Sequence, residues 1–176
     1  GLINDILDLS KVESGKLEVE TIACKPHAIV HEVVQVLAVK ADEKAITLRV
    51  DAKEEIPEVI LSDPARLRQI VTNLVGNAIK FTEQGGVQVL LSVEQKGLAS
   101  EQGQAINSAP AWSYRIDIKD TGVGMTSEQA DRIFDPFAQA DSSVTRKFGG
   151  TGLGLTISKS FAEALQVFDD YLLKNS

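Results

Sequence analysis

Apolar residues recur every three or four positions in four stretches of the chain, which is the period of an amphipathic α-helix. These stretches are residues 2–12, 26–44, 64–81 and 152–165. Asp63 and Pro64 suit the N-cap and first positions of the third stretch. A shorter helix is indicated by Thr126, which forms a capping-box pattern with Gln129 and predicts a helix to about Ile133.

Five stretches have the alternation, or the short apolar run, that is typical of a β-strand. They are residues 17–21, 46–50, 59–61, 87–93 and 112–118. A polar connection over residues 95–111 joins the last two as a long hairpin. Three main helices beside hairpin-joined strands predict an α+β fold, in which helices cover one face of a mixed sheet as a two-layer α/β sandwich. A short helical stub precedes this sandwich, and the doubly wound order of a Rossmann fold is absent.

Composition restricts the function without identifying it. A chain of 176 residues with 43% hydrophobic and 24% charged residues fits one globular domain. A net charge of −7 argues against nucleic acid and anionic membrane as partners, because both require a cationic surface. The single Cys24 excludes an intrachain disulfide and favours a reducing compartment. No apolar run approaches the ~18 residues of a membrane span, so we expect a cytoplasmic segment, although its parent protein could carry a membrane anchor elsewhere.

Two glycine clusters lie within one stretch of the chain, Asp120-Thr-Gly-Val-Gly124 and Gly149-Gly-Thr-Gly-Leu-Gly154. Glycine allows the backbone to approach a ligand closely, and glycines before a helix expose N–H groups that favour phosphate. A nucleotide site is therefore expected. The spacing completes neither GxxxxGK[ST] nor GxGxxG, which disfavours Walker, Rossmann and protein-kinase sites.

The chain instead contains four boxes in a fixed order. They are Asn73-Leu-Val-Gly-Asn-Ala-Ile-Lys-Phe-Thr82, Asp120-Thr-Gly-Val-Gly-Met125, Phe134-Asp-Pro-Phe137 and Gly149-Gly-Thr-Gly-Leu-Gly-Leu155. Together they resemble the N, first-glycine, F and second-glycine boxes of the catalytic ATP-binding domain of sensor histidine kinases. The wider superfamily includes DNA gyrase, mismatch-repair ATPases and a heat-shock chaperone. The likeness covers about residues 62–165 and implies a Bergerat-type ATP-binding fold that binds ATP and Mg²⁺.

The two ends of the chain differ in how they fit this family. Residues 1–16 resemble the end of the second dimerisation helix of hybrid kinases, which implies a four-helix bundle formed by two chains. We therefore expect a dimerisation-helix end at 1–15, a catalytic ATP-binding domain at 16–165 and an atypical tail at 166–176. After Leu165 the Gly-Gly and two further strands of the family are missing. Three explanations for the missing strands remain: the chain is truncated, unobserved residues have been closed up in the numbering, or the tail is non-native.

The third predicted helix carries the expected catalytic residues Asn73, Asn77 and Lys80. Asn73 and Asn77 are four residues apart, so both project from one helical face, where a neutral amide oxygen can ligate Mg²⁺ beside a triphosphate. The family likeness favours Asn77 as the metal ligand. Lys80 lies three residues further on and can neutralise phosphate oxygens. Exposed asparagines are also common on helices, so this assignment depends on the other boxes.

The resemblance assigns the first glycine cluster to adenine. Asp120 corresponds to the residue that reads the adenine amino group, although an aspartate before a glycine is also a common turn cap. Gly122 and Gly124 allow the backbone to pass close to the base, and Met125 is expected to pack near it.

The second glycine cluster is expected to serve the phosphates. Phe134 and Phe137 flank a proline before a polar run that we interpret as a lid. Arg146 and Lys147 are candidate γ-phosphate contacts, with a solvated basic pair as the equal alternative. The residues expected to bind phosphate at the start of the final helix are Gly150, Thr151, Gly152, Leu153 and Gly154.

The sequence also indicates where the phosphoryl group goes. His31-Glu32 lacks the family's following basic-Thr-Pro context, so we expect the acceptor histidine to precede Gly1. Asn73 stands where hydrolysing relatives carry a carboxylate, and an amide cannot act as a general base. Phosphoryl transfer is favoured over hydrolysis, with the chain's own dimerisation domain, a response-regulator receiver and a second copy of the parent protein as partners. The alternatives are an ATPase or conformational clamp of the same superfamily, and a non-catalytic nucleotide-binding module.

Overall fold

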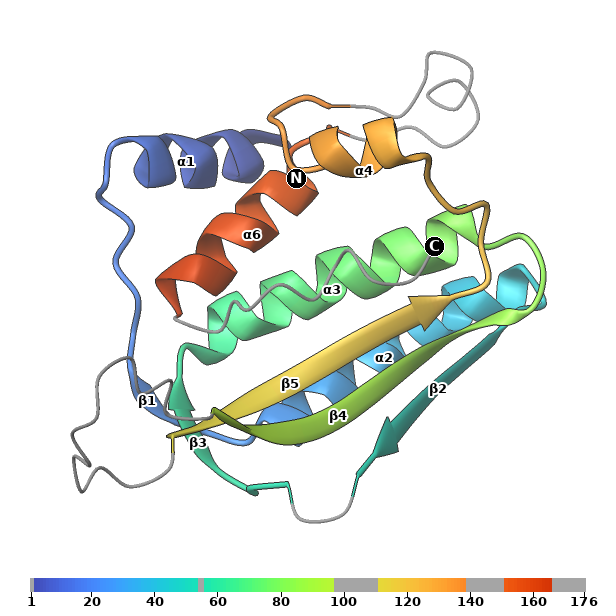
Figure 1. The fold of residues 1–176 in the computed structure, drawn as a ribbon, viewed down its shortest axis with the longest axis horizontal. Coiled ribbons are helices and arrows are strands. Elements are labelled where there is room, and N and C mark those ends of the chain that lie inside the picture. The colour runs from blue at the N-terminus through green and yellow to red at the C-terminus, as the bar shows by residue number, and fades with distance from the viewer. Residues whose placement is uncertain (1, 54–55, 97–110, 139–150, 166–176) are drawn as a thin grey trace, which may run out of the picture.

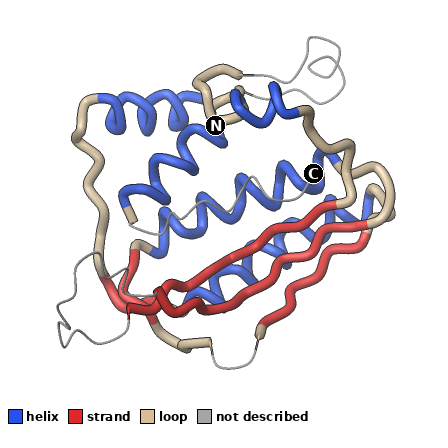
Figure 2. Tube along the Cα trace, viewed as in Figure 1, coloured by secondary structure: helices blue, strands red, loops and turns tan. Residues whose placement is uncertain are grey.

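The computed structural model describes residues 2–53, 56–96, 111–138 and 151–165. Figure 1 shows the arrangement and Figure 2 the helices and strands along the trace. The helices are α1 (Leu2–Glu13), α2 (Pro26–Glu43), α3 (Pro64–Phe81), α4 (Ser127–Arg132) and α6 (Gly154–Ala164). The strands are β1 (Ile22–Cys24), β2 (Thr47–Ala52), β3 (Ile60–Ser62), β4 (Gly86–Lys96) and β5 (Ala111–Asp120). None of the described helices is long and apolar enough to cross a membrane.

The main sheet is mixed, as the sequence predicts. β4 lies in the centre, parallel to β2 and antiparallel to β5. The β4–β5 register runs from Val87 opposite Asp120 to Lys96 opposite Ala111. Asp120 therefore ends β5 beside the start of β4. A separate two-stranded sheet pairs β1 with β3 in antiparallel orientation.

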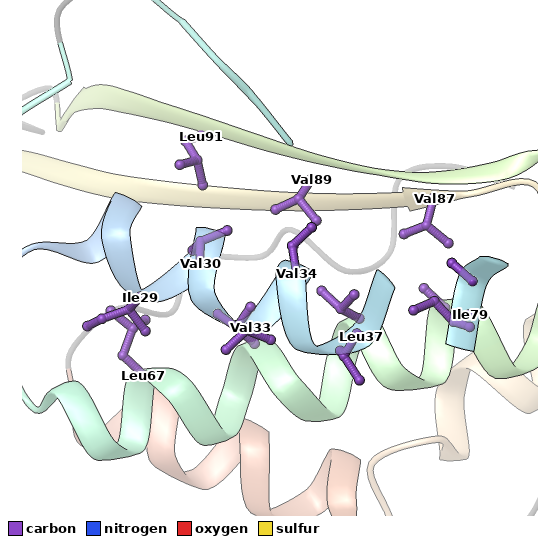
Figure 3. Close-up of a cluster of buried hydrophobic side chains, with 14 of the residues drawn as sticks. Ile29, Val30, Val33, Val34, Leu37, Leu67, Ile79, Val87, Val89 and Leu91 are labelled. Atoms are coloured by element: carbon purple, nitrogen blue, oxygen red, sulfur yellow. The ribbon is translucent and has the colours of Figure 1, made fainter. Parts of the chain in front are cut away.

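One face of the main sheet is covered by α2 and α3, which confirms the α+β sandwich (Figure 1). Alternation along β4 turns Val87, Val89 and Leu91 toward the helices, where they meet Val30 and Val34 of α2 (Figure 3). All five side chains are buried. Burial of apolar side chains of this size contributes about 1.5–3 kcal/mol each, so this layer holds α2 against the sheet.

The start of α3 follows the predicted N-cap. Asp63 is 5% exposed, and its Oδ1 accepts from the backbone N–H groups of Ala65 and Arg66 at 2.9 and 3.0 Å. Its Oδ2 accepts from the backbone N–H of Glu20 at 3.1 Å. One carboxylate therefore caps α3 and also ties the segment before β1 to it.

A second apolar cluster joins α1 to α6. Leu9 of α1 packs with Leu153, Ile157 and Phe161, and all four side chains are buried. Beside it, Asp8 accepts from Arg66 Nη1 at 3.3 Å and from Gln69 Nε2 at 2.9 Å. The helical stub is thus packed against α6 and bonded to α3.

The structure corrects one strand and one helix boundary. Residues 17–21 alternate as predicted in their burial but form no strand, because the segment that pairs with β3 is Ile22–Cys24. The last helix begins at Gly154 rather than at 152, since Gly152 has a φ of +71°, outside the helical range. Residues 97–110 of the predicted hairpin loop lie outside the described residues, and β4 and β5 extend further toward them than predicted.

Candidate functional site

The three expected catalytic residues lie on α3. Asn73, Asn77 and Lys80 are all half-buried and follow one another on a single face of the helix. α3 contacts both β5 and α6, and its contact with α6 includes the side chain of Asn73. The residues of the two glycine clusters therefore have one helix as their common neighbour.

Asn73 connects α3 to α6. Its Nδ2 donates to the Gly154 carbonyl oxygen at 3.3 Å and to Ser158 Oγ at 3.2 Å. A side chain at Gly154 would place its Cβ 3.5 Å from the Asn73 amide. The first turn of α6 is therefore set directly against the asparagine face of α3.

Lys80 lies on the last turn of α3. Its Nζ is 4.7 Å from the centre of the Phe81 ring. Burial lowers the pKa of the Lys80 ammonium, because a partly desolvated charge is less stable than a hydrated one. An anionic ligand at this position would favour the charged form and raise the pKa again.

The turn after β5 is closed by Asp120 and packed against the end of α3. Asp120 Oδ1 accepts from the backbone N–H of Gly122 at 2.8 Å, while none of the described residues donates to Oδ2. A Cβ at Gly122 would lie 2.6 Å from the Phe81 carbonyl oxygen, so only glycine fits this approach. The N–H of Val123 donates to the same oxygen at 3.4 Å.

The rest of this turn faces outward. Gly124 has a φ of +67° with open space where a Cβ would stand, and Met125 is 48% exposed. An exposed methionine beside an open backbone is a surface that a planar base could cover. The Thr121 hydroxyl accepts from the Gly86 N–H at 3.0 Å and donates to the Gln84 carbonyl at 2.9 Å, which fixes the turn to the start of β4.

The aromatic box is attached to the second glycine cluster. Thr156 Oγ1 donates to the Phe134 carbonyl at 2.8 Å, and the N–H of Phe137 donates to the Gly152 carbonyl at 3.2 Å. Phe137 has a φ of +61° and its side chain is 64% exposed. A Cβ at Gly152 would lie 3.0 Å from the Phe137 Cα, so this crossing also requires glycine.

The residues before α6 divide between the site and the core. Thr151 Oγ1 accepts from the Leu153 N–H at 3.2 Å and donates to Asp5 Oδ2 of α1 at 3.4 Å. Leu153 is buried in the α1–α6 cluster, which makes its side chain a core residue. Arg146, Lys147 and Gly150 lie outside the described residues.

Lys44 supports the site from the end of α2 and was not predicted from the sequence. Lys44 follows α2, and its Nζ donates to the carbonyl oxygens of Ile79, Lys80 and Thr82 at the end of α3. No local pattern around Lys44 indicates this role, because the contacts join residues 35 to 38 positions apart.

Comparison with known proteins identifies this arrangement. A family model described as "Histidine kinase-, DNA gyrase B-, and HSP90-like ATPase" matches residues 62–169, more than half of the chain. The signal transduction histidine-protein kinase BarA of Escherichia coli (strain K12) is 41% identical over 164 residues, covering 93% of this chain and 17% of BarA. Histidine kinase 2 of Arabidopsis thaliana is 38% identical over 206 residues, covering 94% of this chain and 18% of that protein. The chain thus spans less than a fifth of either relative.

Solved structures agree with this family. Full-length ShkA, solved in complex with AMPPNP, matches with a TM-score of 0.74 at 31% identity, covering 94% of this chain and 30% of ShkA. The catalytic domain of the histidine kinase ThkA matches with a TM-score of 0.60 at 20% identity, covering 85% of this chain and 82% of that one. At 20% identity, the similarity to ThkA shows a shared fold and nothing more.

Proposed function

Because this chain belongs to the histidine kinase-, DNA gyrase B- and HSP90-like ATPase family, we propose that it is the catalytic domain of a two-component sensor histidine kinase. It binds ATP and transfers the γ-phosphoryl group to a histidine of the parent protein's dimerisation domain, on a segment that precedes Gly1. The curated relatives, which are named histidine kinases, support this activity.

The observation that carries the proposal is the attachment of both glycine clusters to α3. The turn at Gly122 approaches the carbonyl of Phe81, and Gly154 accepts from Asn73. A ligand bordered by Asn77 and Lys80 would therefore have the first cluster near the end of α3 and the second cluster along its length. In this proposal adenine binds at the first cluster, where the Asp120 carboxylate can accept from its amine. The phosphates bind at the second cluster, where glycines before a helix expose N–H groups.

Asp120 supplies the specificity for adenine in this proposal. Its Oδ1 is held by the Gly122 N–H, which orients the carboxylate and leaves Oδ2 as an acceptor for the exocyclic amine. A guanine presents a carbonyl oxygen at the corresponding position, and that oxygen would face the carboxylate without a proton between them. Asp120 is exposed in this structure, and a bound base would cover it; a polar group that is covered by a ligand without receiving a partner discriminates strongly between ligands.

The donor set fits Mg²⁺ held jointly with the triphosphate. Mg²⁺ commonly takes one or two protein oxygens and completes its shell with phosphate and water. Asn77 would provide the protein oxygen, and no cluster of three His, Cys, Asp or Glu side chains occurs among the described residues. Bound in this way, Mg²⁺ would neutralise the negative charge of the phosphates during transfer.

The chain's own residues then act by position and charge. The acceptor imidazole nitrogen forms a bond to the γ-phosphorus while the bond to the β–γ bridging oxygen breaks, and ADP leaves with that oxygen. Lys80 places a positive charge beside the phosphates, and Asn73 holds the first turn of α6 at fixed distance from α3. Asn73 cannot deprotonate a water molecule, which favours transfer over hydrolysis.

Further partners follow from the same proposal. A two-component kinase passes its phosphoryl group to a response-regulator receiver, and it works as a homodimer through its dimerisation helices. The homodimer is supported by α1, the segment that resembles a dimerisation helix, because it leaves four large apolar side chains exposed: Leu2, Ile3, Ile6 and Leu7. The proposed location of this domain is the cytoplasm, where ATP is available.

Isothermal titration calorimetry with ATP and GTP, each with and without Mg²⁺, tests nucleotide binding. We expect saturable ATP binding that Mg²⁺ strengthens and a much weaker response to GTP. Failure to bind ATP at millimolar concentration would instead favour a non-catalytic interaction module.

A further inference from the structure

Lys44 contacts the end of the helix that carries the site. Its Nζ donates to the carbonyl oxygens of Ile79 at 2.7 Å, Lys80 at 2.8 Å and Thr82 at 2.8 Å. The last four carbonyls of a helix have no partner within the helix, and together they form its negative end. A lysine is the side chain best suited to this position, since it offers three donors and a positive charge.

The remaining carbonyl of this turn has a different partner. Phe81 O accepts from the N–H of Val123 and lies against Gly122. Four successive carbonyls, at residues 79–82, are thus divided between Lys44 and the turn that follows Asp120. Lys44 fixes the surface on which that turn rests.

This turn of α3 also holds the residues proposed to meet the phosphates. Asn77 lies within five residues of the carbonyls that Lys44 holds, and the carbonyl of Lys80 is one of them. Without the Lys44 charge, the negative end of α3 would have less compensation beside the proposed adenine turn and about one helical turn from Asn77. Loss of Lys44 would therefore disturb both the spacing between Asp120 and Asn77 and the local potential.

We propose that Lys44 is a positioning residue for the nucleotide, which fixes the last turn of α3 relative to the Asp120 turn and neutralises the end of the helix that carries Asn77 and Lys80. This inference rests on the proposed function. It assigns a role in ligand binding to a residue that does not itself touch the ligand.

A control at the other end of α3 distinguishes nucleotide positioning by Lys44 from a purely structural role. Asp63 caps the start of α3 with two hydrogen bonds from backbone N–H groups of that helix, and it accepts a third from Glu20. It is buried, and its loss costs stability through the same helix. Asp63→Ala therefore destabilises α3 without altering its nucleotide-facing end.

The test measures the Kd for Mg–ATP by calorimetry, together with the melting temperature, for the wild-type chain and for Lys44→Met, Lys44→Arg and Asp63→Ala. Lys44→Met removes three charged hydrogen bonds that fix the end of α3, so we expect it to weaken binding about tenfold or more. Lys44→Arg, which keeps the positive charge, should retain most of the wild-type affinity for ATP. Asp63→Ala should lower the melting temperature at least as much as Lys44→Met does. It should leave the Kd within about twofold, well below the tenfold change, equal to 1.4 kcal/mol, that is expected for Lys44→Met.

Binding of ATP by Lys44→Met as tight as wild type would overturn the inference and leave the proposed function intact. An equal loss of affinity in Asp63→Ala would also overturn it, because the effect would then be general destabilisation. If Lys44→Met does not fold, Lys44→Gln replaces it, since the amide keeps a donor but no charge. If the wild-type chain binds no ATP, the proposed function fails first and the inference with it.

Discussion

The side-chain nitrogen of Asn73 donates to the carbonyl oxygen of Gly154, 81 residues further along the chain, at 3.3 Å. This bond joins the helix with the asparagine face to the first residue of α6. It explains why an amide suits this position, since a carboxylate has no hydrogen to donate. Asn73 thus has a structural task that the spacing of the boxes does not reveal.

Asn73→Asp should destabilise the chain by about 1–3 kcal/mol, the range for a buried hydrogen bond replaced by an unsatisfied group. The new carboxylate would face the Gly154 carbonyl without a proton between them. Urea unfolding at pH 7 measures the difference. Asn77→Asp is the matched control, because it adds the same charge one turn later where no described residue bonds to the amide. Equal destabilisation by the two variants would show that the Gly154 bond contributes nothing.

Asp120→Asn should weaken ATP binding about tenfold or more and reduce the preference for ATP over GTP, because the adenine amine loses its anionic acceptor. Titrations with both nucleotides measure the ratio. Asp117→Asn is the control on the same strand, since its carboxylate is occupied by Arg115 Nε at 2.8 Å. An unchanged ATP-to-GTP ratio in Asp120→Asn would exclude Asp120 as the adenine-reading residue.

ATP affinity should fall as the pH rises through the lowered pKa of Lys80, below the ordinary value of 10.5. The folded chain binds this proton less tightly than the unfolded chain, so the buried charge opposes folding at neutral pH. That cost falls as the pH rises from the lowered pKa of the folded chain to the ordinary value of 10.5, above which the unfolded chain has also lost the proton. A bound phosphate favours the charged form of Lys80, so the lysine side chain takes up a proton when the nucleotide binds.

Calorimetry in buffers of different ionisation enthalpy measures this proton uptake between pH 7.5 and 10. Lys80→Met should abolish the uptake and flatten the pH dependence of the Kd. If the variant and the wild type take up the same number of protons, Lys80 does not face the phosphates.

Gly122→Ala and Gly76→Ala should shift stability in opposite directions. A Cβ at Gly122 would lie 2.6 Å from the Phe81 carbonyl oxygen, whereas nothing lies within 4 Å of one at Gly76. Alanine inside a helix is favoured over glycine by about 0.5–1 kcal/mol, so Gly76→Ala should raise the melting temperature. Gly122→Ala should lower it, since the turn must move away from α3. A neutral Gly122→Ala would mean that this approach is easily relaxed.

Local signals in the sequence were sufficient for the helices. Asp63-Pro64 marks the start of α3, and Thr126 with Gln129 forms both bonds of the predicted capping box. The strand at 17–21 was wrong because alternation reports which side chains face inward, while a strand also needs a partner. The partner, β3, pairs with residues 22–24 instead.

The candidate site was predictable in its residues but not in its connections. Spacing alone places Asn73 and Asn77 on one face of a helix, and the boxes name the turn at Asp120. The contacts that join these parts are long-range, such as Lys44 to the end of α3 and Asp5 to Thr151, 146 residues apart. Such contacts arise from the packing of α2, α3 and α6, and no pattern within a short stretch encodes them.

Transfer of labelled phosphate tests the central proposal most directly. The chain is mixed with ATP labelled at the γ-phosphate, Mg²⁺ and a separate dimerisation domain of the parent protein that carries its histidine. Label should appear on that domain in an acid-labile, base-stable form and should be lost when the histidine is replaced. Release of labelled inorganic phosphate at the same rate with and without the histidine domain, and with no label on it, would contradict a kinase and indicate an ATPase of the same family.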